Sequence, residues 1–234
     1  MSVLKKLLIG KVYKNEIPPY NPIQKRILNI SSIWNNDHHD DNGIEKLVRL
    51  FLAMSQLLFP GIYIKYCWYK ISYEYQDLVM DIYVILKVMF PFLILINSWQ
   101  ENRILIAIMV YVLLETVLYI PTLIFASDLF AKPRSYKRSM LLLFFNYVEI
   151  VVAFGVLYTL GSNMNQPFHH WFDPVYFSIV CSSSIGFGDY YPVTTYGKVL
   201  VSIQAMFFLS FVVLFLNFFT TKIKTKGYFD NDIE

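Results

Sequence analysis

Four long apolar stretches with few charges place the tightest limit on how this chain can fold. They cover residues 78–99, 104–125, 140–160 and 199–219. Each is long enough to cross the ~30 Å hydrocarbon core of a bilayer as a helix. Hydrophobic residues make up 56% of the 234-residue chain and charged residues only 16%, a composition that excludes an ordinary soluble domain. The sequence therefore predicts an all-α, multi-pass membrane protein.

A fifth stretch, residues 47–68, is a weaker candidate for a membrane span. It contains Arg49 and Lys65, and Pro60-Gly61 interrupts it. Charges and a helix-breaking pair both disfavour a straight spanning helix. Two readings stay open: a fifth span, or a segment that lies along the inner membrane surface or re-enters. The expected fold class therefore has four or five membrane helices.

The interval between the last two stretches cannot be a lipid-exposed span. It contains residues that break helices: Gly186, Gly188 and Pro192. Irregular backbone at membrane depth is tolerated only where it is buried in protein or lines a water-filled path. Before it, Asp173 can cap free amides and Pro174 suits the first position of a helix. We expect a short re-entrant helix over residues 173–183, followed by an extended segment.

The two alternating glycines indicate what this extended segment does. Glycine reaches backbone φ values closed to other residues, so successive carbonyls can face the same side. Carbonyl oxygens that surround an axis replace the water around a weakly hydrated cation. One chain supplies only one row of oxygens, so a closed ring needs several copies, arranged as a symmetric oligomer.

The residues of this segment carry a family resemblance. "SSIGFGD", followed by "YYPVTTYGK", resembles the selectivity filter and outer mouth of tetrameric potassium channels, whose usual filter reads Thr-Val-Gly-Tyr-Gly-Asp. The similarity is continuous over residues 173–198 and weaker over 140–221. It implies a homotetramer in the membrane that conducts K⁺ passively, has no cofactor and catalyses no reaction.

The resemblance also implies roles for individual residues. The carbonyls of the filter would hold K⁺, and the Ser184 hydroxyl would complete the innermost site. The ion-binding segment is Ser184, Ile185, Gly186, Phe187 and Gly188. The residues expected to support it are Asp189, Val180 and Ser183. The C-terminal dipole end of the short helix would stabilise a cation in the central cavity.

Three positions depart from the usual family pattern. Ser184 stands where threonine is usual, so the hydroxyl remains but the stiffening β-branch is lost. Phe187 replaces tyrosine. Val180 stands where some members carry a glutamate that bonds the filter aspartate, so Asp189 needs another partner.

The inner helix is expected to line the cavity and inner mouth with one face. Residues at helical spacing on this face are Ser210, Val213, Asn217, Thr220 and Thr221. An interhelical hydrogen bond is an equally good reading for Asn217. The position of the family's hinge glycine is Phe208, with Ala205 and Ser210 the nearest small residues.

The basic residues predict the orientation if the pore loop enters from outside. The connector before residue 140 and the C-terminal tail would then be cytoplasmic under the positive-inside rule. Their basic residues are Lys132, Arg134, Lys137, Arg138, Lys222, Lys224 and Lys226. The N-terminal arm is also basic, which slightly favours the reading in which residues 47–68 do not span.

Charged residues within the spans are few. No helix carries the regularly spaced Arg or Lys of a voltage sensor. Four ionisable residues are expected mainly to pair and hold the helices together: Asp81, Lys87, Glu115 and Glu149. His169 and His170 could sense external pH, although exposed loop histidines are usually inert. His38, His39, Asp40 and Asp41 fit a solvated turn better than a metal site.

The expected organisation has four parts. They are a polar arm (1–43), peripheral membrane helices (44–138), a pore domain (139–222) and a short tail (223–234). The pore domain is divided into an outer helix (139–160), the pore helix (173–183), the filter (184–189) and an inner helix (198–221).

A potassium-selective channel in the cell membrane is the function that these observations favour. The alternative is a non-selective channel or a regulatory, non-conducting subunit. A membrane enzyme or receptor would need reactive groups near Gly186, yet residues 173–197 contain no His, Lys or Glu. Nothing indicates nucleic-acid binding. The expected partners are further copies of the chain, the bilayer, and a regulatory ligand or subunit of unknown kind.

Overall fold

The computed structural model describes residues 21–37, 42–71, 75–126 and 136–220 of the chain. Within these ranges all regular structure is helical, apart from one isolated β-bridge between Met164 and Pro192. This confirms the all-α membrane fold expected from the sequence.

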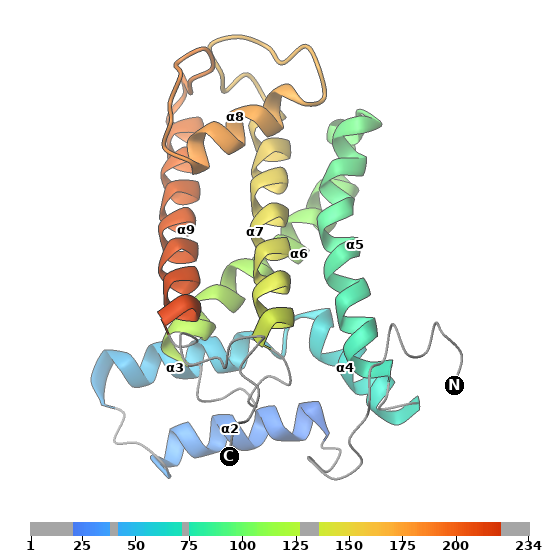
Figure 1. The fold of residues 1–234 in the computed structure, drawn as a ribbon, viewed down its shortest axis with the longest axis vertical. Helices are drawn as coiled ribbons and strands as arrows, with labels where there is room; N and C mark the ends of the chain where they lie inside the picture. The colour runs from blue at the N-terminus through green and yellow to red at the C-terminus, as the bar shows by residue number, and fades with distance from the viewer. Residues whose placement is uncertain (1–20, 38–41, 72–74, 127–135, 221–234) are drawn as a thin grey trace, which may run out of the picture.

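Among the described residues, four helices are long and apolar enough to cross a membrane. They are α5 (Gln76–Ile96), α6 (Arg103–Phe125), α7 (Tyr136–Thr159) and α9 (Thr195–Thr220). α7 and α9 stand nearly parallel, and α5 stands beside α7 (Figure 1). Each corresponds to one of the four apolar stretches, with ends shifted by a few residues.

A tight turn joins α5 to α6. It contains the short 3₁₀ helix η2 (Trp99–Glu101). The Asn102 side chain accepts hydrogen bonds from the amides of Ile104 and Leu105, at 3.0 and 3.3 Å, and so caps the start of α6. This cap fixes where the chain re-enters the apolar layer.

The weak fifth stretch is not a straight helix. It forms α3 (Gly43–Ser55) and α4 (Pro60–Ile71), which are bent by 57° relative to each other. The break precedes Pro60, where the sequence predicted an interruption. α3 and the preceding helix α2 (Pro22–Asn35) run across the end of the molecule at which α7 begins (Figure 1). The chain therefore has four spans, or five if the bent pair is counted as one.

α7 is the centre of the packing. Of its apolar window 61% is buried inside the chain, against 28% or less for each of the other three spans. α7 contacts α5, α6, α8 and α9, and its residues from Ile150 to Tyr158 are buried. The short helix α8 (Asp173–Ser182) lies across the end of the molecule between α7 and α9 (Figure 1). α7 therefore supports both the peripheral helices and the pore loop.

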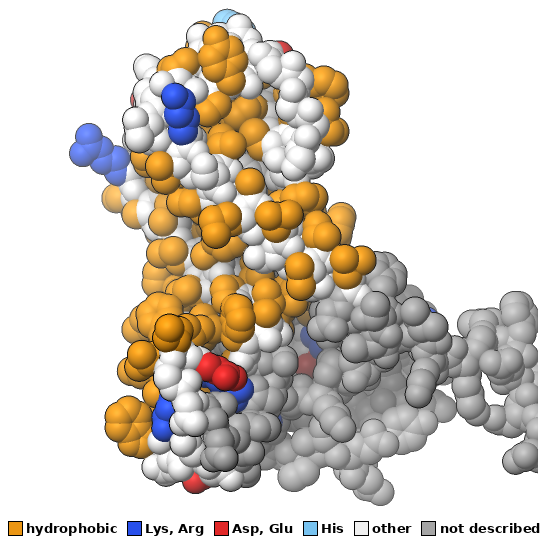
Figure 2. Space-filling model, turned by 90° about the vertical axis from the view of Figure 1, so that its left-hand side faces the viewer, with side chains coloured by type: hydrophobic (Ala, Val, Ile, Leu, Met, Phe, Trp, Pro, Cys, Tyr) orange, Lys and Arg blue, Asp and Glu red, His pale blue; other side chains and the backbone are white. Residues whose placement is uncertain are grey.

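The surface agrees with a chain that sits in lipid. On the face drawn in Figure 2, hydrophobic side chains gather over the middle height of the molecule, and charged side chains lie toward its two ends. Large apolar side chains remain exposed on α5, α6 and α9. Such a band would be unstable in water but is stable against hydrocarbon or a neighbouring subunit.

Candidate functional site

The loop after α8 has an alternating backbone. Ser184, Gly186 and Gly188 have φ values of +56°, +62° and +81°, whereas Ile185 and Phe187 between them keep negative φ. The sequence predicted this freedom for the two glycines but not for Ser184. Alternation between left- and right-handed φ turns successive carbonyls toward the same side, which is the arrangement that a row of ion ligands needs.

Ser184 owes its φ to the end of α8. Its amide donates to the Cys181 carbonyl at 3.2 Å, and the Ile185 amide donates to the Val180 carbonyl at 3.2 Å. This pair of bonds is a Schellman motif, in which the residue just past the helix takes a left-handed conformation. Glycine is usual there, and a β-branched side chain would be more strained than serine. The motif joins the pore helix directly to the first residue of the loop.

The start of α8 differs from the expectation in two respects. Pro174 lies in the first turn, but as the second residue of the helix and not at the first position that the sequence predicted. Asp173 does not cap the amides of α8: its Oδ2 accepts hydrogen bonds from the backbone amides of His169 and His170, each at 2.9 Å. The prediction of an Asp173 cap was wrong because these preceding amides fold back onto the carboxylate.

The electrostatics of Asp173 follow from these bonds. Burial disfavours its charged form, but the amides of His170 and His169 and the Tyr190 hydroxyl hold the pKa of Asp173 below its ordinary value. The carboxylate therefore stays ionised and keeps the loop before α8 in place. His169 and His170 are exposed and contribute their backbone amides to this contact.

A buried hydrogen-bond network joins α8 to α7 and α9. Gln204 of α9 is only 1% exposed, and its Nε2 donates to Ser182 Oγ at 2.6 Å and to Ser178 Oγ at 2.7 Å. Its Oε1 accepts from the Tyr158 hydroxyl at 2.5 Å. Ser178 Oγ also donates to the Val151 carbonyl of α7 at 2.5 Å. One side chain thus holds the pore helix between its two neighbours.

Gln204 was not among the residues predicted from the sequence. The available signal was a lone amide in the middle of an apolar helix, where an unsatisfied polar group is costly and therefore finds a partner. The serines at positions 178 and 182 lie one helical turn apart on α8, which matches the two donor directions of an amide.

A second set of bonds holds the outer end of the loop. The side chains of Asn165 and Gln166 donate to the Asp189 carbonyl at 3.0 and 3.1 Å. Asn165 Oδ1 accepts from the Tyr191 amide at 2.9 Å, and the Asn165 amide donates to the Tyr191 carbonyl at 3.0 Å. The segment between α7 and α8 therefore clamps the chain just beyond the filter.

The expected supporting residues have distinct surroundings. Val180 is buried and offers no polar group. The Asp189 carboxylate lies near the Tyr176 hydroxyl and contributes to raising the pKa of that hydroxyl, after burial of the ring. Tyr176 is therefore the side chain nearest in role to the missing glutamate partner of Asp189. Ser183 Oγ donates to the Ile179 carbonyl at 2.8 Å, so it stabilises the last turn of α8.

Two of the expected cavity residues can be placed. Val213 is 56% exposed on α9, and Ser210 is partly exposed with its hydroxyl donating to the Met206 carbonyl at 3.0 Å. The side chains of Asn217 and Thr220, and the whole of Thr221, lie outside the described residues. α9 is one helix from Thr195 to Thr220, with Phe208 in its middle.

The intramembrane charges pair across helices. Lys87 Nζ of α5 lies 3.4 Å from Glu149 Oε2 of α7 and 3.7 Å from Glu115 Oε2 of α6. Lys87 also donates to Thr116, whose Oγ1 donates to Glu149 at 2.8 Å. Asp81 pairs elsewhere, with Arg138 at 2.6 Å. The pairing role was expected, and Lys87 connects the peripheral helices to the outer helix of the pore domain.

The described residues hold no group of three or more His, Cys, Asp or Glu side chains that could bind a metal ion. His38, His39, Asp40 and Asp41 lie outside those residues. Cys67 and Cys181 are free thiols. The donors that the loop offers to an ion are backbone carbonyls and one hydroxyl, which suit a hard cation held by oxygen.

A short helix held between two spanning helices, followed by a loop of alternating φ, defines a membrane ion channel. Residues 143–225 match a family model described as an ion channel. That family has two membrane helices with a pore loop between them, and it includes K⁺ channels. The matched residues run from α7 to past the end of α9, so this part of the chain is similar to the pore-loop channel family. No curated protein and no solved structure matches the chain.

Proposed function

We propose that the chain forms a potassium-selective channel, with K⁺ bound in single file along residues 184–188. The observation that carries this proposal is the alternating positive φ at Ser184, Gly186 and Gly188. It turns the carbonyls of successive residues toward one side, as a filter for a weakly hydrated ion requires. The filter sequence supports K⁺ over other cations through its resemblance to potassium channels.

We propose that four copies assemble around the loop. In the single chain Ile185 and Phe187 are 57% and 67% exposed, and α9 leaves Met206 69% exposed. These apolar side chains are available for contacts with neighbouring copies. One row of carbonyls cannot replace a hydration shell alone, so several copies must close the ring.

We propose that the arm and the C-terminal tail lie in the cytoplasm. The basic residues Lys137 and Arg138 at the start of α7 support this orientation under the positive-inside rule. The proposed chemistry is passive conduction without a cofactor or a catalysed reaction. The lack of His, Lys and Glu in residues 173–197 agrees with this.

A second candidate is a non-selective channel or a non-conducting regulatory subunit. Ser184 favours it, because a serine in a left-handed conformation leaves the innermost site without the β-branch that restricts χ1. The clamp from Asn165 and Gln166 on Asp189 argues for a loop that is held in place.

The test is reconstitution of the purified full-length chain in liposomes. We expect K⁺ flux to exceed Na⁺ flux by at least about tenfold, which corresponds to ~1.4 kcal/mol of discrimination. Equal fluxes would support the non-selective reading, and no flux from a folded assembly would support the regulatory one. Native mass measurement of the same sample should give four copies, and a conducting monomer or dimer would exclude the proposed ring.

A further inference from the structure

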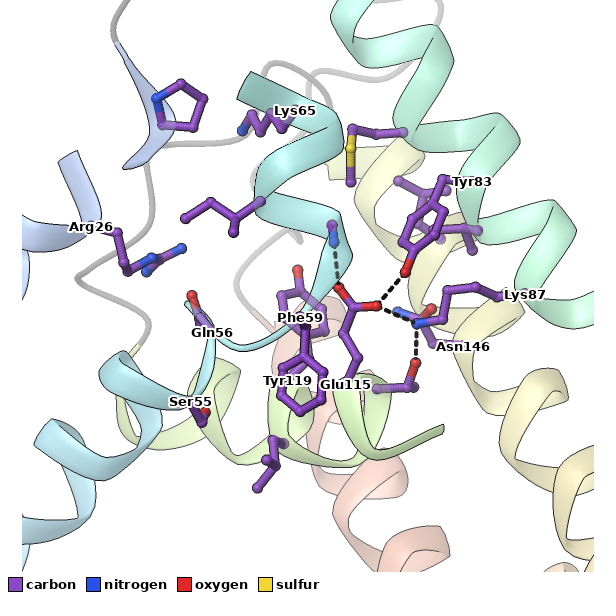
Figure 3. A pocket seen from close by; sticks show the side chains of 18 of the residues that line it. Arg26, Ser55, Gln56, Phe59, Lys65, Tyr83, Lys87, Glu115, Tyr119 and Asn146 are labelled. Atoms are coloured by element: carbon purple, nitrogen blue, oxygen red, sulfur yellow. Dashed lines mark hydrogen bonds and ion pairs between the residues drawn. The ribbon is translucent and has the colours of Figure 1, made fainter. Parts of the chain in front are cut away.

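A cavity of about 320 Å³ lies among α2, α4, α5, α6 and α7, away from the pore loop. Figure 3 shows Lys87 and Asn146 on one side of this pocket and Arg26 and Gln56 on the other. Apolar side chains form much of the wall between them. They are Phe59, Ile62, Met80, Val84, Leu118 and Leu142. The cavity is therefore a second concave site, separate from the one that the pore loop forms.

The charged residues of the lining already have partners. Lys87 Nζ lies 3.7 Å from Glu115 Oε2 and 3.4 Å from Glu149 Oε2. Glu115 also accepts hydrogen bonds from the Tyr83 hydroxyl and from the Gly61 amide, the latter at 3.1 Å. Each of the other basic lining residues interacts with another group of the chain. They are Lys25, Arg26 and Lys65. Because no charge in the lining needs a counter-ion, an uncharged ligand fits this cavity better than an ion.

Two amide side chains of the lining lack such partners. Asn146 of α7 is only 6% exposed, yet its side chain makes no hydrogen bond within the part of the chain that the structure describes. Gln56, just after α3, has a buried Nε2 that is also without a hydrogen-bond partner among the described residues. Burial of a polar group without a hydrogen bond is costly, so such groups normally have a partner in the protein, in water or in a ligand. The cavity therefore offers hydrogen-bonding groups that the chain itself does not use.

Apolar walls with a few unpaired amides are typical of a site for an uncharged amphiphile. In small-molecule sites the apolar lining binds the body of the ligand, and a few polar groups fix its orientation. The Asn146 amide both donates and accepts, so it can exchange hydrogen bonds with a ligand group that does the same, such as an amide or a hydroxyl. Water can occupy the polar end of the cavity, but the apolar wall gives it no hydrogen-bond partners. The volume is at the lower end of the range of small-ligand sites, which favours a compact molecule.

We propose that this cavity binds a compact, uncharged and largely apolar molecule through one amide or hydroxyl group, which exchanges hydrogen bonds with Asn146. Asn146 lies one helical turn before Glu149 on α7, and Glu149 pairs with Lys87 of α5. A molecule in the cavity contacts α4, α5, α6 and α7 together. Its binding therefore stabilises the packing of the peripheral helices against the outer helix of the pore domain.

The test measures binding of a tritiated naphthalene carboxamide to the purified full-length protein in detergent. This uncharged probe joins an apolar ring system to one amide. Isopropylnaphthalene is the matched competitor, because it keeps the shape of the probe and lacks its polar atoms. We expect saturable binding to the parent protein, and displacement should need at least about tenfold more isopropylnaphthalene than unlabelled carboxamide. Binding without saturation would show that the cavity holds water alone, and it would overturn the proposal.

The variant Asn146→Leu tests the proposed hydrogen bonds. It nearly keeps the size of the side chain and removes the amide, so the carboxamide should bind about tenfold more weakly while isopropylnaphthalene loses nothing. Asn97→Leu is the matched control, since it makes the same change at an exposed asparagine just past the end of α5 and outside the cavity. We expect a change of less than about threefold in this control. Equal losses in the two variants, or an unchanged preference for the carboxamide in Asn146→Leu, would overturn the assignment.

Two further measurements test the location of the bound molecule. Ile62→Trp enlarges a side chain of the apolar wall and should abolish saturable binding, and parent-like binding to the folded variant would place the ligand elsewhere. An azido derivative of the probe keeps the test independent of whether the variants fold. On the parent protein we expect it to label residues 59–65 and 142–149, and labelling confined to α9 would overturn the proposal. All these measurements report binding alone, so they stand or fall separately from K⁺ selectivity.

Discussion

Gln204 Nε2 in the inner helix donates a 2.6 Å hydrogen bond to Ser182 Oγ, the last residue of the pore helix. Ser182 lies only two residues before Ser184, where the loop begins its alternation of φ. α9 therefore holds the point from which the loop of alternating φ starts.

We expect Gln204→Leu to reduce both stability and selectivity. It leaves the buried polar groups of Ser178, Ser182 and Tyr158 without their shared partner, and each such group costs about 1–3 kcal/mol. The K⁺/Na⁺ permeability ratio should fall and the Tm of the assembly should decrease. Ser202→Ala is the control. Ser202 is exposed on the same helix, and its hydroxyl donates to the Lys198 carbonyl one turn earlier. Parent-like selectivity in a folded Gln204→Leu channel would contradict the positioning role.

Gly188→Ala should abolish selective conduction while the assembly survives. A Cβ at Gly188 would meet no atom of its own chain within 4 Å, so the penalty comes from the φ of +81° alone. That penalty is about 1–2 kcal/mol per copy. Gly43→Ala is a matched control, since Gly43 also has positive φ and open space but begins α3. The carbonyl arrangement would be disproved by an unchanged permeability ratio in Gly188→Ala.

Ser184→Ala should weaken block by internal Ba²⁺ and leave K⁺ the preferred ion. The substitution removes the hydroxyl oxygen but keeps a Cβ at the same φ, so the backbone strain is unchanged. Ba²⁺ is a sensitive probe because, with twice the charge of K⁺, it interacts more strongly with each oxygen ligand. Ser183→Ala serves as the control, because that hydroxyl bonds the Ile179 carbonyl within α8. Equal block in both variants would remove the hydroxyl from the innermost site.

Lys87→Met should destabilise the fold by about 3–5 kcal/mol, the usual cost of leaving a buried charge without its partner. Here two carboxylates, Glu115 and Glu149, would face each other without the ammonium between them. Adding Glu149→Gln to Lys87→Met should recover part of the loss, because it removes one of the two like charges. Thermal unfolding of the parent, of Lys87→Met, of Glu149→Gln and of the double variant measures this. A purely additive double variant would show that the pair does not interact.

Conduction should depend only weakly on voltage. Each gating charge that crosses the field contributes about 2.3 kcal/mol per 100 mV, so steep opening needs several charges moving together. Lys87, the one basic residue in the interior of α5, is held between two carboxylates and cannot move as a free charge. Current recordings across a wide voltage range check this, and an activation curve with three or more gating charges per subunit would refute it.

The features that the sequence predicted well are those set by local chemistry. The four spans follow from the length of uninterrupted apolar runs, and the start of α8 follows from Pro174. The break before Pro60 lies where a helix-breaking pair stands. Backbone freedom at Gly186 and Gly188 could also be predicted, because only glycine adopts such φ values at little cost.

The features that it missed depend on contacts between distant residues. Asp173 was expected to cap α8, but the preceding loop supplies closer amides. The Asp189 carbonyl is held by Asn165 and Gln166, more than twenty residues earlier. Arg138 meets Asp81 across 57 positions of the sequence. No local sequence pattern indicates such pairs, because each of these residues, taken alone, is of a type that is common in loops and at helix ends.

The burial of α7 has a consequence for how copies of the chain meet. Its run from Ile150 to Tyr158 is almost entirely covered by helices of its own subunit, whereas α9 leaves Leu209 62% and Leu216 59% exposed. This part of α7 is therefore closed to contacts between copies in the proposed assembly, whereas α9 has apolar side chains available for them. Changes in that run alter the stability of a single subunit, and changes on the outer side of α9 alter which partners it accepts. Fold and assembly can thus be varied through separate sets of residues.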